Sequence, residues 1–484
     1  MTTQNLTTLK GLLTALFLLS FTSVLAQPTT YDGPQSVLIK NGLVKTITQG
    51  DLPNTDVYIV NGIIQEIGQD LSVPTNTPVI DATDKVVMPG IVDAHSHLNT
   101  VSTNEATSPV TSEITIKESI DPNDVAIYHA LAGGVTSINL MHGSANVIGA
   151  RNATLKLRYG ADQFGLQFQE APQTIKFALG ENPTRVHGQG TGVQPRTRMG
   201  VERVIRDIFD DAIEYDRKRE TYLEQKAAHE RRPNRVALPV PVAKNLRLEV
   251  ISDIIEGDIL VHCHSYRADE IMMLVNVFKD YGVENYTFQH ANEGFKVAPE
   301  LAEAGANASV FSDWWAYKFE VYYSTAYNAA ILHENGVNTS INSDSNELIR
   351  HLNHEAAKVV RYGGISENDA LKMITINPAK QLGIDEYVGS LEVGKHGDVS
   401  IWSADPLSIY AVNEMTLVDG QVLFNRKTDA PDARLDRAIS HDQSFDDLQS
   451  EVSESIRGRQ DDACMEDAFK LFESGHQSEQ SHNY

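Results

Sequence analysis

The sequence predicts an α/β fold: a (β/α)8 TIM-like barrel with a small composite β-sandwich domain built from both chain ends. Between residues 89 and 384, apolar strand-like runs alternate with helical segments such as 123–132 and 367–375, which is the rhythm of parallel β/α units. Several of these runs end in a residue that can bind a metal. Because the chemistry of such barrels takes place where the strands end, both observations favour a closed barrel with an active site.

The two ends of the chain show a different pattern. Residues 36–40 alternate apolar and polar side chains and are followed by turns of the Asn-Gly type, which indicate hairpins. A similar alternation returns at residues 414–424. We therefore expect residues 32–88 and 385–426 to form one small sandwich beside the barrel.

Residues 182–243 break the barrel rhythm. This stretch is rich in arginine and then helical, with both signs of charge dense over residues 207–232, and it is longer than an ordinary connection. As an insertion near the barrel mouth it would be a lid or an oligomer contact. A solvated charged helix is the simpler interpretation.

Residues 1–26 are expected to be a secretory signal peptide. Lys10 precedes the apolar run 11–19, and small residues before Gln27 supply a cleavage site near Ala26. The run is too short to span a membrane, although a retained N-terminal anchor is the alternative. We therefore expect an exported protein, periplasmic or extracellular, without stable membrane insertion.

The opposite end of the chain, residues 427–484, is polar and acidic and is expected to be mobile. The only cysteines are Cys263 and Cys464, so the exported protein cannot have a disulfide framework. It must rely on its hydrophobic core for stability.

The composition is that of a soluble enzyme. The chain has 484 residues, of which 41% are hydrophobic, enough for one large barrel and a smaller domain. A formal net charge of -25 disfavours nucleic acid and anionic membranes as partners. The expected partner is a small-molecule or short-peptide substrate. The sequence does not decide whether the protein forms a homo-oligomer.

The most informative stretch is residues 88–97, where an apolar run ends in His95 and His97. In a strand successive side chains face opposite ways, so the two imidazoles point together while Ser96 points away. Neutral imidazole suits zinc, iron, nickel or cobalt. By itself the pair is equally explained by two hydrogen-bonded histidines at a strand end.

Four later runs add candidate ligands. Lys176 shares a strand face with small residues, His262 and His264 share another, and two further runs end in a histidine and in an acid. Each has a simpler explanation: the lysine could snorkel, a histidine could be a core residue, and the acid could cap a helix. Together the candidates beyond the first pair are Lys176, His262, His264, His290 and Asp344.

In this order the segments resemble the amidohydrolase superfamily, with His-x-His on the first barrel strand, lysine on the fourth, histidines on the fifth and sixth, and aspartate on the eighth. The resemblance covers residues 32–425, because 89–97 looks like the entry motif of the family and 389–398 like its exit motif. The chain is most similar to the imidazolonepropionase-like and prolidase-like branch. The fifth-strand motif of that branch resembles residues 264–267, which favours His264 over His262 as a ligand.

The resemblance implies a metal-dependent hydrolase of a non-ester carbon–nitrogen bond. Bound zinc lowers the pKa of a water to about 7 and so generates hydroxide near neutral pH. With two ions, Lys176 carboxylated by carbon dioxide would bridge them, and Asp344 would move the proton. Glu181 is the competing bridge. The implied ligands are His95, His97 and Asp344 for one ion and His264 and His290 for the other.

Specificity resides on the loops after the strands. The candidate substrate-binding residues are His142, Asn146, Tyr266 and Arg267, with aromatic walls from residues 313–317. Three functions stay open: a binuclear amide or peptide hydrolase, which we favour; a mononuclear imidazolonepropionase-like cyclic amidase or deaminase; and a catalytically silent exported binding protein. The substrate could be a dipeptide, a cyclic imide, an N-acyl amino acid or a lactone.

Overall fold

A computed structural model describes residues 29–314 and 318–429 of the chain. The predicted signal peptide, residues 1–26, and all but the first residues of the predicted mobile tail lie outside this part. Both stay predictions. Within the described part, no helix is long and apolar enough to cross a membrane.

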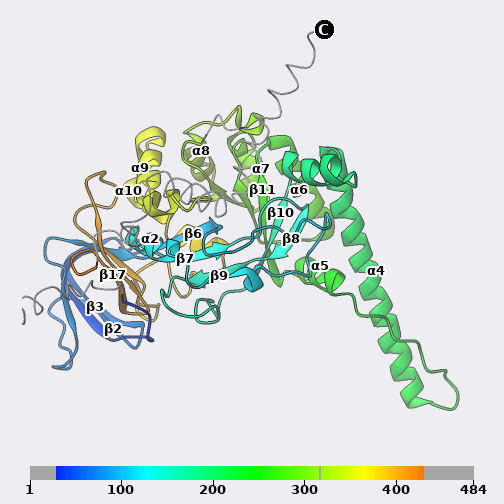
Figure 1. Cartoon of the computed structure of the whole chain (residues 1–484), viewed down its shortest axis with the longest axis horizontal. Helices are drawn as coiled ribbons and strands as arrows, with labels where there is room; N and C mark the ends of the chain where they lie inside the picture. The colour runs from blue at the N-terminus through cyan, green and yellow to red at the C-terminus, as the bar shows by residue number, and fades with distance from the viewer. Residues whose placement is uncertain (1–28, 315–317, 430–484) are drawn as a thin grey trace, which may run out of the picture.

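Strands from both ends of the chain meet in one eight-stranded sheet, seen at the left of Figure 1. The order is β17-β16-β15-β5-β1-β2-β3, with β4 paired to β1. The contact between the two ends is the antiparallel pair β5–β15, which sets Val87 opposite Ile401. The strands are β1 (Val37–Lys45), β2 (Asp51–Val60), β3 (Ile63–Gly68), β4 (Val79–Asp81), β5 (Val86–Pro89), β15 (Val399–Trp402), β16 (Asn413–Val418) and β17 (Gln421–Asn425).

This sheet corrects part of the sequence prediction. The two ends do share one unit, and its core includes Ile39, Val57 and Ile401. The predicted two-sheet sandwich is not confirmed, because the β5–β15 pair joins the strands of both ends in a single continuous ladder.

The part of the fold that contains the predicted ligands is TIM-barrel-like, but its described strands do not form a closed barrel. One sheet has the order β14-β13-β12-β11-β10-β8 and another the order β6-β7-β9. Neighbours from β10 to β14 are parallel. These strands are β6 (Ile91–Ser96), β7 (Val135–Leu140), β8 (Ile148–Arg151), β9 (Ala153–Lys156), β10 (Gln173–Ala178), β11 (Ile259–Ser265), β12 (Tyr286–His290), β13 (Asn307–Val310) and β14 (Asn338–Ile341).

The closed barrel predicted from the sequence is therefore not confirmed, for a local reason. The segment from β8 to β9 pairs antiparallel with β10 on one side and with β7 on the other. This segment pairs with the edges of β7 and β10 that would otherwise hydrogen-bond to each other in a closed barrel. On the opposite side, the Asp344 backbone N–H donates to the His95 carbonyl at 3.1 Å, so the end of β6 lies next to the chain after β14.

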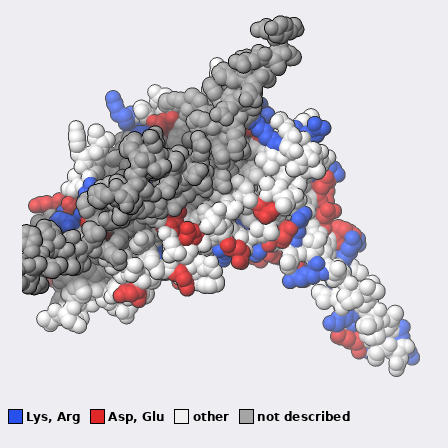
Figure 2. All heavy atoms as spheres, in the orientation of Figure 1, with Lys and Arg blue, Asp and Glu red and all other residues white. Residues whose placement is uncertain are grey.

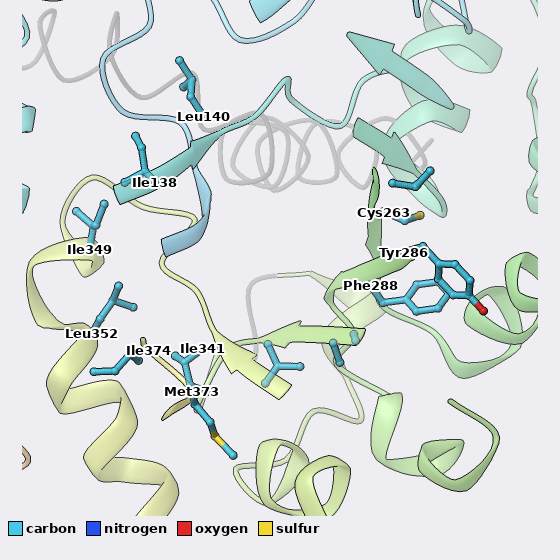
Figure 3. Close-up of a cluster of buried hydrophobic side chains, with 14 of the residues drawn as sticks. Ile138, Leu140, Cys263, Tyr286, Phe288, Ile341, Ile349, Leu352, Met373 and Ile374 are labelled. Carbon is cyan, nitrogen blue, oxygen red and sulfur yellow. The ribbon is translucent and has the colours of Figure 1, made fainter. Parts of the chain in front are cut away.

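Helices pack against these strands and enclose the main core. Figure 3 shows part of this core, with Ile138 and Leu140 of β7, Phe288 of β12 and Ile341 of β14. The α-helices are α2 (Ala126–Ala132), α3 (Glu181–Pro183), α4 (Arg198–Arg231), α5 (Leu246–Glu256), α6 (Ala268–Tyr281), α7 (Ala298–Glu303), α8 (Asn328–Glu334), α9 (Leu352–Gly363), α10 (Glu367–Lys372) and α11 (Ile376–Gln381). Short turns of other helix types are η1 (Ile116–Ser119), η2 (Thr184–Thr191), η3 (Gly294–Lys296), η4 (Phe319–Val321) and η5 (Leu348–His351).

Helix α6 shows how the sequence specifies such an element. Its buried residues Ile271, Leu274, Val275 and Phe278 recur at the spacing of one helical face. Acidic residues occupy its first turn, where they complement the helix dipole. The helix ends at Gly282, whose φ of 74° is the left-handed conformation that glycine adopts without strain.

The insertion contains α4, a helix of 34 residues that projects from the body at the right of Figure 1. It begins after Thr197, whose side chain accepts a hydrogen bond from the Gly200 N–H. Its buried residues are confined to the first half and end at Tyr215. The second half is therefore an arm outside the core.

A buried ion-pair cluster joins the barrel part to the eight-stranded sheet. The fully buried Lys156 ammonium on β9 lies 3.0 Å from the Asp398 carboxylate and also pairs with Asp419, whose other oxygen accepts from Arg158 at 2.7 Å. Burial works to raise the pKa of Asp419, but Lys156 and Arg158 outweigh it and hold that pKa at about 2. The two parts are thus joined by charges that compensate one another.

Lys156→Ala should lower the free energy of unfolding by about 3–5 kcal/mol, because it leaves the buried Asp398 carboxylate without its cation and Asp419 with Arg158 alone. Urea denaturation followed by circular dichroism measures this change. Lys226→Ala, at an exposed position on α4, is the matched control and should be neutral. Equal effects of the two substitutions would show that the cluster does not stabilise the fold.

Candidate metal centre

The candidate ligands come together at the carboxyl ends of the strands. His95 and His97 lie at the end of β6, Lys176 lies on β10, His264 on β11 and His290 at the end of β12. Asp344 follows β14. Because parallel strands place their carboxyl ends at one edge, residues far apart in sequence reach a common site. Five of the six are at most 1% exposed, and His97 is 9% exposed.

Three of these side chains present acceptor atoms to one another. The Nε2 atoms of His95 and His97 are 3.2 Å apart, and each lies 3.3 Å from Asp344 Oδ1. Burial above all, with the charge of Lys176 next, lowers the pKa of His95 well below its ordinary value. Burial therefore favours the uncharged form of the His95 ring.

The other candidates surround this group. Lys176 Nζ lies 3.2 Å from His95 Nε2. His290 Nε2 lies 2.9 Å from His264 Nδ1 and 3.8 Å from Asp344 Oδ2. Burial lowers the pKa of both His264 and His290 well below the ordinary value. All six predicted ligands thus belong to one buried cluster.

Hydrogen bonds on the far side of two rings fix which nitrogen faces the cluster. Gln289 Oε1 and the Met141 carbonyl can only accept, so His95 Nδ1 donates to the first at 3.1 Å and His97 Nδ1 to the second at 2.9 Å. In a neutral imidazole this leaves the Nε2 lone pair on the cluster side. Such outer partners are typical of histidines that bind a metal.

The cluster contains groups that a cation would satisfy. Neither carboxylate oxygen of Asp344 has a hydrogen-bond donor among the described residues, although Asp344 is only 1% exposed. Ligand atoms of His95, His290 and Asp344 lie within 4.8 Å of one another. A buried carboxylate facing neutral imidazoles is costly without a positive charge, so the residues fit a divalent metal.

The backbone is strained at two of the candidates. His290 has a φ of 66° and Asp344 a φ of 44°, in the left-handed region that side chains other than glycine and asparagine rarely adopt. Such conformations concentrate at functional sites. His290 ends β12 and Asp344 follows β14, and at both positions the side chain turns toward the cluster.

The two alternative ligands occupy different positions. His262 is buried, and its Nδ1 accepts from Gln289 Nε2 at 2.9 Å. Glu181 forms an ion pair with Arg185 at 3.6 Å, and the structure records no contact between it and the six clustered residues. Lys176, by contrast, contacts His95 directly. The geometry favours Lys176 over Glu181 as the bridge.

Two candidate substrate-binding residues, His142 and Asn146, lie in the loop after β7 and form hydrogen bonds to backbone groups there. The Glu105 N–H donates to His142 Nε2 at 2.8 Å, so His142 Nδ1 carries the proton and donates to the Gly143 carbonyl at 2.9 Å. Burial lowers the pKa of His142 to about 4. The Asn146 amide donates to the carbonyls of Glu105 and Ser108, each at 2.8 Å. These hydrogen bonds occupy polar atoms of both side chains, so they disfavour the predicted contact of His142 and Asn146 with a substrate. That contact stays a prediction.

The other two candidates differ in position. Tyr266 is buried and stacks on His290, with ring centres 5.0 Å apart, so it lies against the cluster. Arg267 makes two hydrogen bonds of 2.9 Å to Asp269 on the surface. Of the predicted aromatic walls, Trp314 stacks on Phe311, which stacks on His290. Residues 315–317 lie outside the described part.

Two residues of the site escaped the sequence analysis. Gln289 holds His95, as described above. Asp93 accepts hydrogen bonds from the His95 backbone N–H and the Ser343 side chain, and burial raises its pKa to about 7. It ties β6 to the chain after β14. Neither Gln289 nor Asp93 belongs to a recognisable pattern of metal ligands in the sequence. The only sequence signal is proximity, because Gln289 directly precedes His290 and Asp93 stands two residues before His95.

Comparison with known proteins agrees with this geometry. A model of the Amidohydrolase family matches residues 86–423, most of the chain. The chain belongs to this family. The resemblance found in the sequence is thus confirmed, and membership supports a hydrolase that acts on carbon–nitrogen bonds. Members bind divalent metals, which agrees with the His95, His290 and Asp344 group.

Solved structures and curated relatives extend the comparison. A crystal structure of an amidohydrolase from Thermotoga maritima MSB8 is 32% identical with a TM-score of 0.72, over 81% of this chain and 100% of that one. Amidohydrolase tasK of Hapsidospora irregularis is 27% identical over 76% of this chain, which spans only 40% of the length of that relative. A dihydroorotase of Citrifermentans bemidjiense is 35% identical, but the match covers only 24% of each chain.

Gln289→Leu should weaken divalent metal binding by about 10- to 100-fold, because His95 loses the acceptor that holds its Nδ1–H. Titration against a chelating indicator measures the affinity. Gln289→Glu, which keeps an acceptor at this position, should bind more tightly than the leucine variant. Gln225→Leu, exposed on α4, is the control. An unchanged affinity in Gln289→Leu would contradict the assigned role.

Proposed function

We propose that this protein is a binuclear metal-dependent hydrolase that cleaves an amide bond, either linear or in a ring. The observation that carries the binuclear form is the position of Lys176, whose Nζ lies 3.2 Å from His95 Nε2 inside the cluster. An ammonium cannot bind a cation. Carboxylation by carbon dioxide would convert it into a carbamate with two oxygens, one for each of two ions.

The remaining candidates divide between the two ions. His95, His97 and Asp344 would hold one. His264 and His290, whose Nδ1 and Nε2 atoms lie 2.9 Å apart, would hold the other. Histidine nitrogens and carboxylate oxygens are the ligands that zinc prefers. A bound divalent ion supplies Lewis acidity at the amide carbonyl and lowers the pKa of a water toward neutrality.

Asp344 is the proposed proton carrier. Its carboxylate is buried and, within the described residues, receives no hydrogen bond. It can accept the proton of the attacking water and deliver it to the leaving nitrogen, which breaks the carbon–nitrogen bond without releasing a free amide anion. Tyr266 and Phe311 stack on His290 and form part of the wall beside the proposed proton carrier.

The carbon–nitrogen specificity rests on the family and on the names of its members. The relatives include a dihydroorotase and a dihydropyrimidinase, which support a cyclic amide as one substrate class. Linear amides such as N-acyl amino acids and dipeptides fit the same chemistry. We also propose export, on the signal-peptide pattern of residues 1–26.

A mononuclear cyclic amidase or deaminase is the second candidate. The ligand atoms of His95, His290 and Asp344, within 4.8 Å of one another, are sufficient for a single ion. In that case Lys176 would stay an ammonium and would act on the substrate rather than on the metal. The number of bound ions separates the two functions.

The purified protein should hold two metal equivalents, and Lys176→Ala should lose one of them. Glu181→Ala should keep both, because Glu181 pairs with Arg185 instead. Inductively coupled plasma mass spectrometry after desalting measures the stoichiometry. If only the Glu181 variant loses an equivalent, the bridge is Glu181. If the unmodified protein holds a single ion, the mononuclear function replaces the binuclear one.

The purified protein should hydrolyse at least one compound from a panel of hydantoins, dihydropyrimidines, N-acyl amino acids and dipeptides. With the best of these substrates, Asp344→Asn should lower kcat by about 10²- to 10⁴-fold. Asp211→Asn, exposed on α4, should leave kcat unchanged. Activity on esters alone, or full activity of Asp344→Asn, would contradict the proposal.

A further inference from the structure

The end of the α4 arm is basic and apolar, unlike the rest of the molecule. Residues 231–245, the tip segment, include Arg231, Arg232 and Arg235 and no acidic residue, in a chain with a net charge of -25. Leu238 is 69% exposed and Val240 is 87% exposed. Figure 2 shows the arm standing clear of the body at the lower right. Exposed apolar side chains flanked by cations suit an apolar surface with an acidic rim.

The tip segment has a defined conformation. His229 Nδ1 bonds to the Val236 carbonyl at 2.6 Å, and the Val236 N–H donates to the Arg232 carbonyl at 3.0 Å. In the described part of the chain, Arg231, Arg232 and Arg235 form no ion pair. A binding segment held in one conformation loses little entropy when it docks.

A groove of matching character lies between α6 and α7. Its volume is about 610 Å³, and its floor includes Val275, Phe278 and Tyr286. Its rim carries the exposed carboxylates of Glu284, Glu300 and Glu303, which outnumber the one exposed lysine in its lining, Lys279. The groove opens beside Tyr286, where β12 begins, whereas His290 ends that strand at the metal cluster. It is therefore separate from the catalytic site.

The tip segment cannot reach the groove of its own chain. The base of α4 packs on α6, where Arg206 pairs with Asp280 at 3.0 Å and Tyr281 donates to Asp210 at 2.7 Å. From Asp210 to Arg231 a helix extends about 30 Å at 1.5 Å per residue. The arm therefore carries the tip away from α6, and an occupant for this groove must come from another molecule.

We propose that two copies of the chain form a closed two-fold dimer. The tip segment of each copy docks in the α6–α7 groove of the other. The chain itself supplies both complementary surfaces, and reciprocal exchange closes the assembly. Leu238 and Val240 cover the apolar floor, and the arginines face Glu284, Glu300 and Glu303. Nucleic acid or an anionic membrane is disfavoured as a partner, because the net charge of -25 repels both.

Sedimentation velocity of the full chain tests this dimer. The unmodified protein should be dimeric at micromolar concentration. Two charge-reversal variants should raise the dimer dissociation constant at least tenfold: Arg231→Glu with Arg232→Glu and Arg235→Glu in the tip, and Glu284→Lys with Glu300→Lys and Glu303→Lys in the groove. A control variant reverses exposed charges elsewhere, Glu66→Lys with Glu118→Lys and Glu367→Lys, and should stay dimeric.

Mixing the tip variant with the groove variant gives the decisive result. Each variant is weakened alone. In a mixed dimer the reversed tip meets the reversed groove and the unmodified tip meets the unmodified groove, so both contacts pair opposite charges and mixed dimers should form. Circular dichroism and metal content establish that both variants fold. A monomeric unmodified protein, a dimer indifferent to either reversal, or a mixture without mixed dimers would overturn the proposal. So would binding of the monomer to anionic vesicles or RNA through the tip.

Discussion

The structure depends on one electrostatic constraint: a buried carboxylate and two buried imidazoles turn their acceptor atoms toward one another, next to the Lys176 amine. His95 Nε2, His97 Nε2 and Asp344 Oδ1 lie within 3.3 Å of one another. Gln289 and the Met141 carbonyl hold the imidazole protons on the far side of the rings. Such an arrangement is unfavourable for a protein alone and favourable around a cation. The cluster is therefore best understood as a site built for a metal.

The fold supplies what this cluster needs. Parallel strands β10 to β14 place their carboxyl ends together, and Asp93 joins β6 to the chain after β14 through Ser343. The eight-stranded sheet is attached through the buried ion pairs of Lys156, far in the sequence from Asp398 and Asp419. The α4 arm lies outside this arrangement.

Much of the site could be predicted from the sequence, because strand alternation is local. The alternation placed His95 and His97 on one strand face and His262 and His264 on another. In the structure the first pair lies at the end of β6 and the second pair lies in β11. Strand closure is not local: the segment from β8 to β9 takes the edges of β7 and β10, and no periodicity reveals such pairing. Gln289 was equally hidden, since its role exists only through its contacts with His95 and His262.

Anomalous X-ray diffraction at the absorption edge of the bound metal tests the central claim most directly. We expect anomalous density about 2.0–2.2 Å from ligand atoms of His95, His97 and Asp344, with a second peak coordinated by His264 and His290. Density elsewhere, such as at the exposed acidic group of Asp253, Glu256 and Asp258, would contradict it. So would crystals soaked in zinc whose buried cluster stays without a peak.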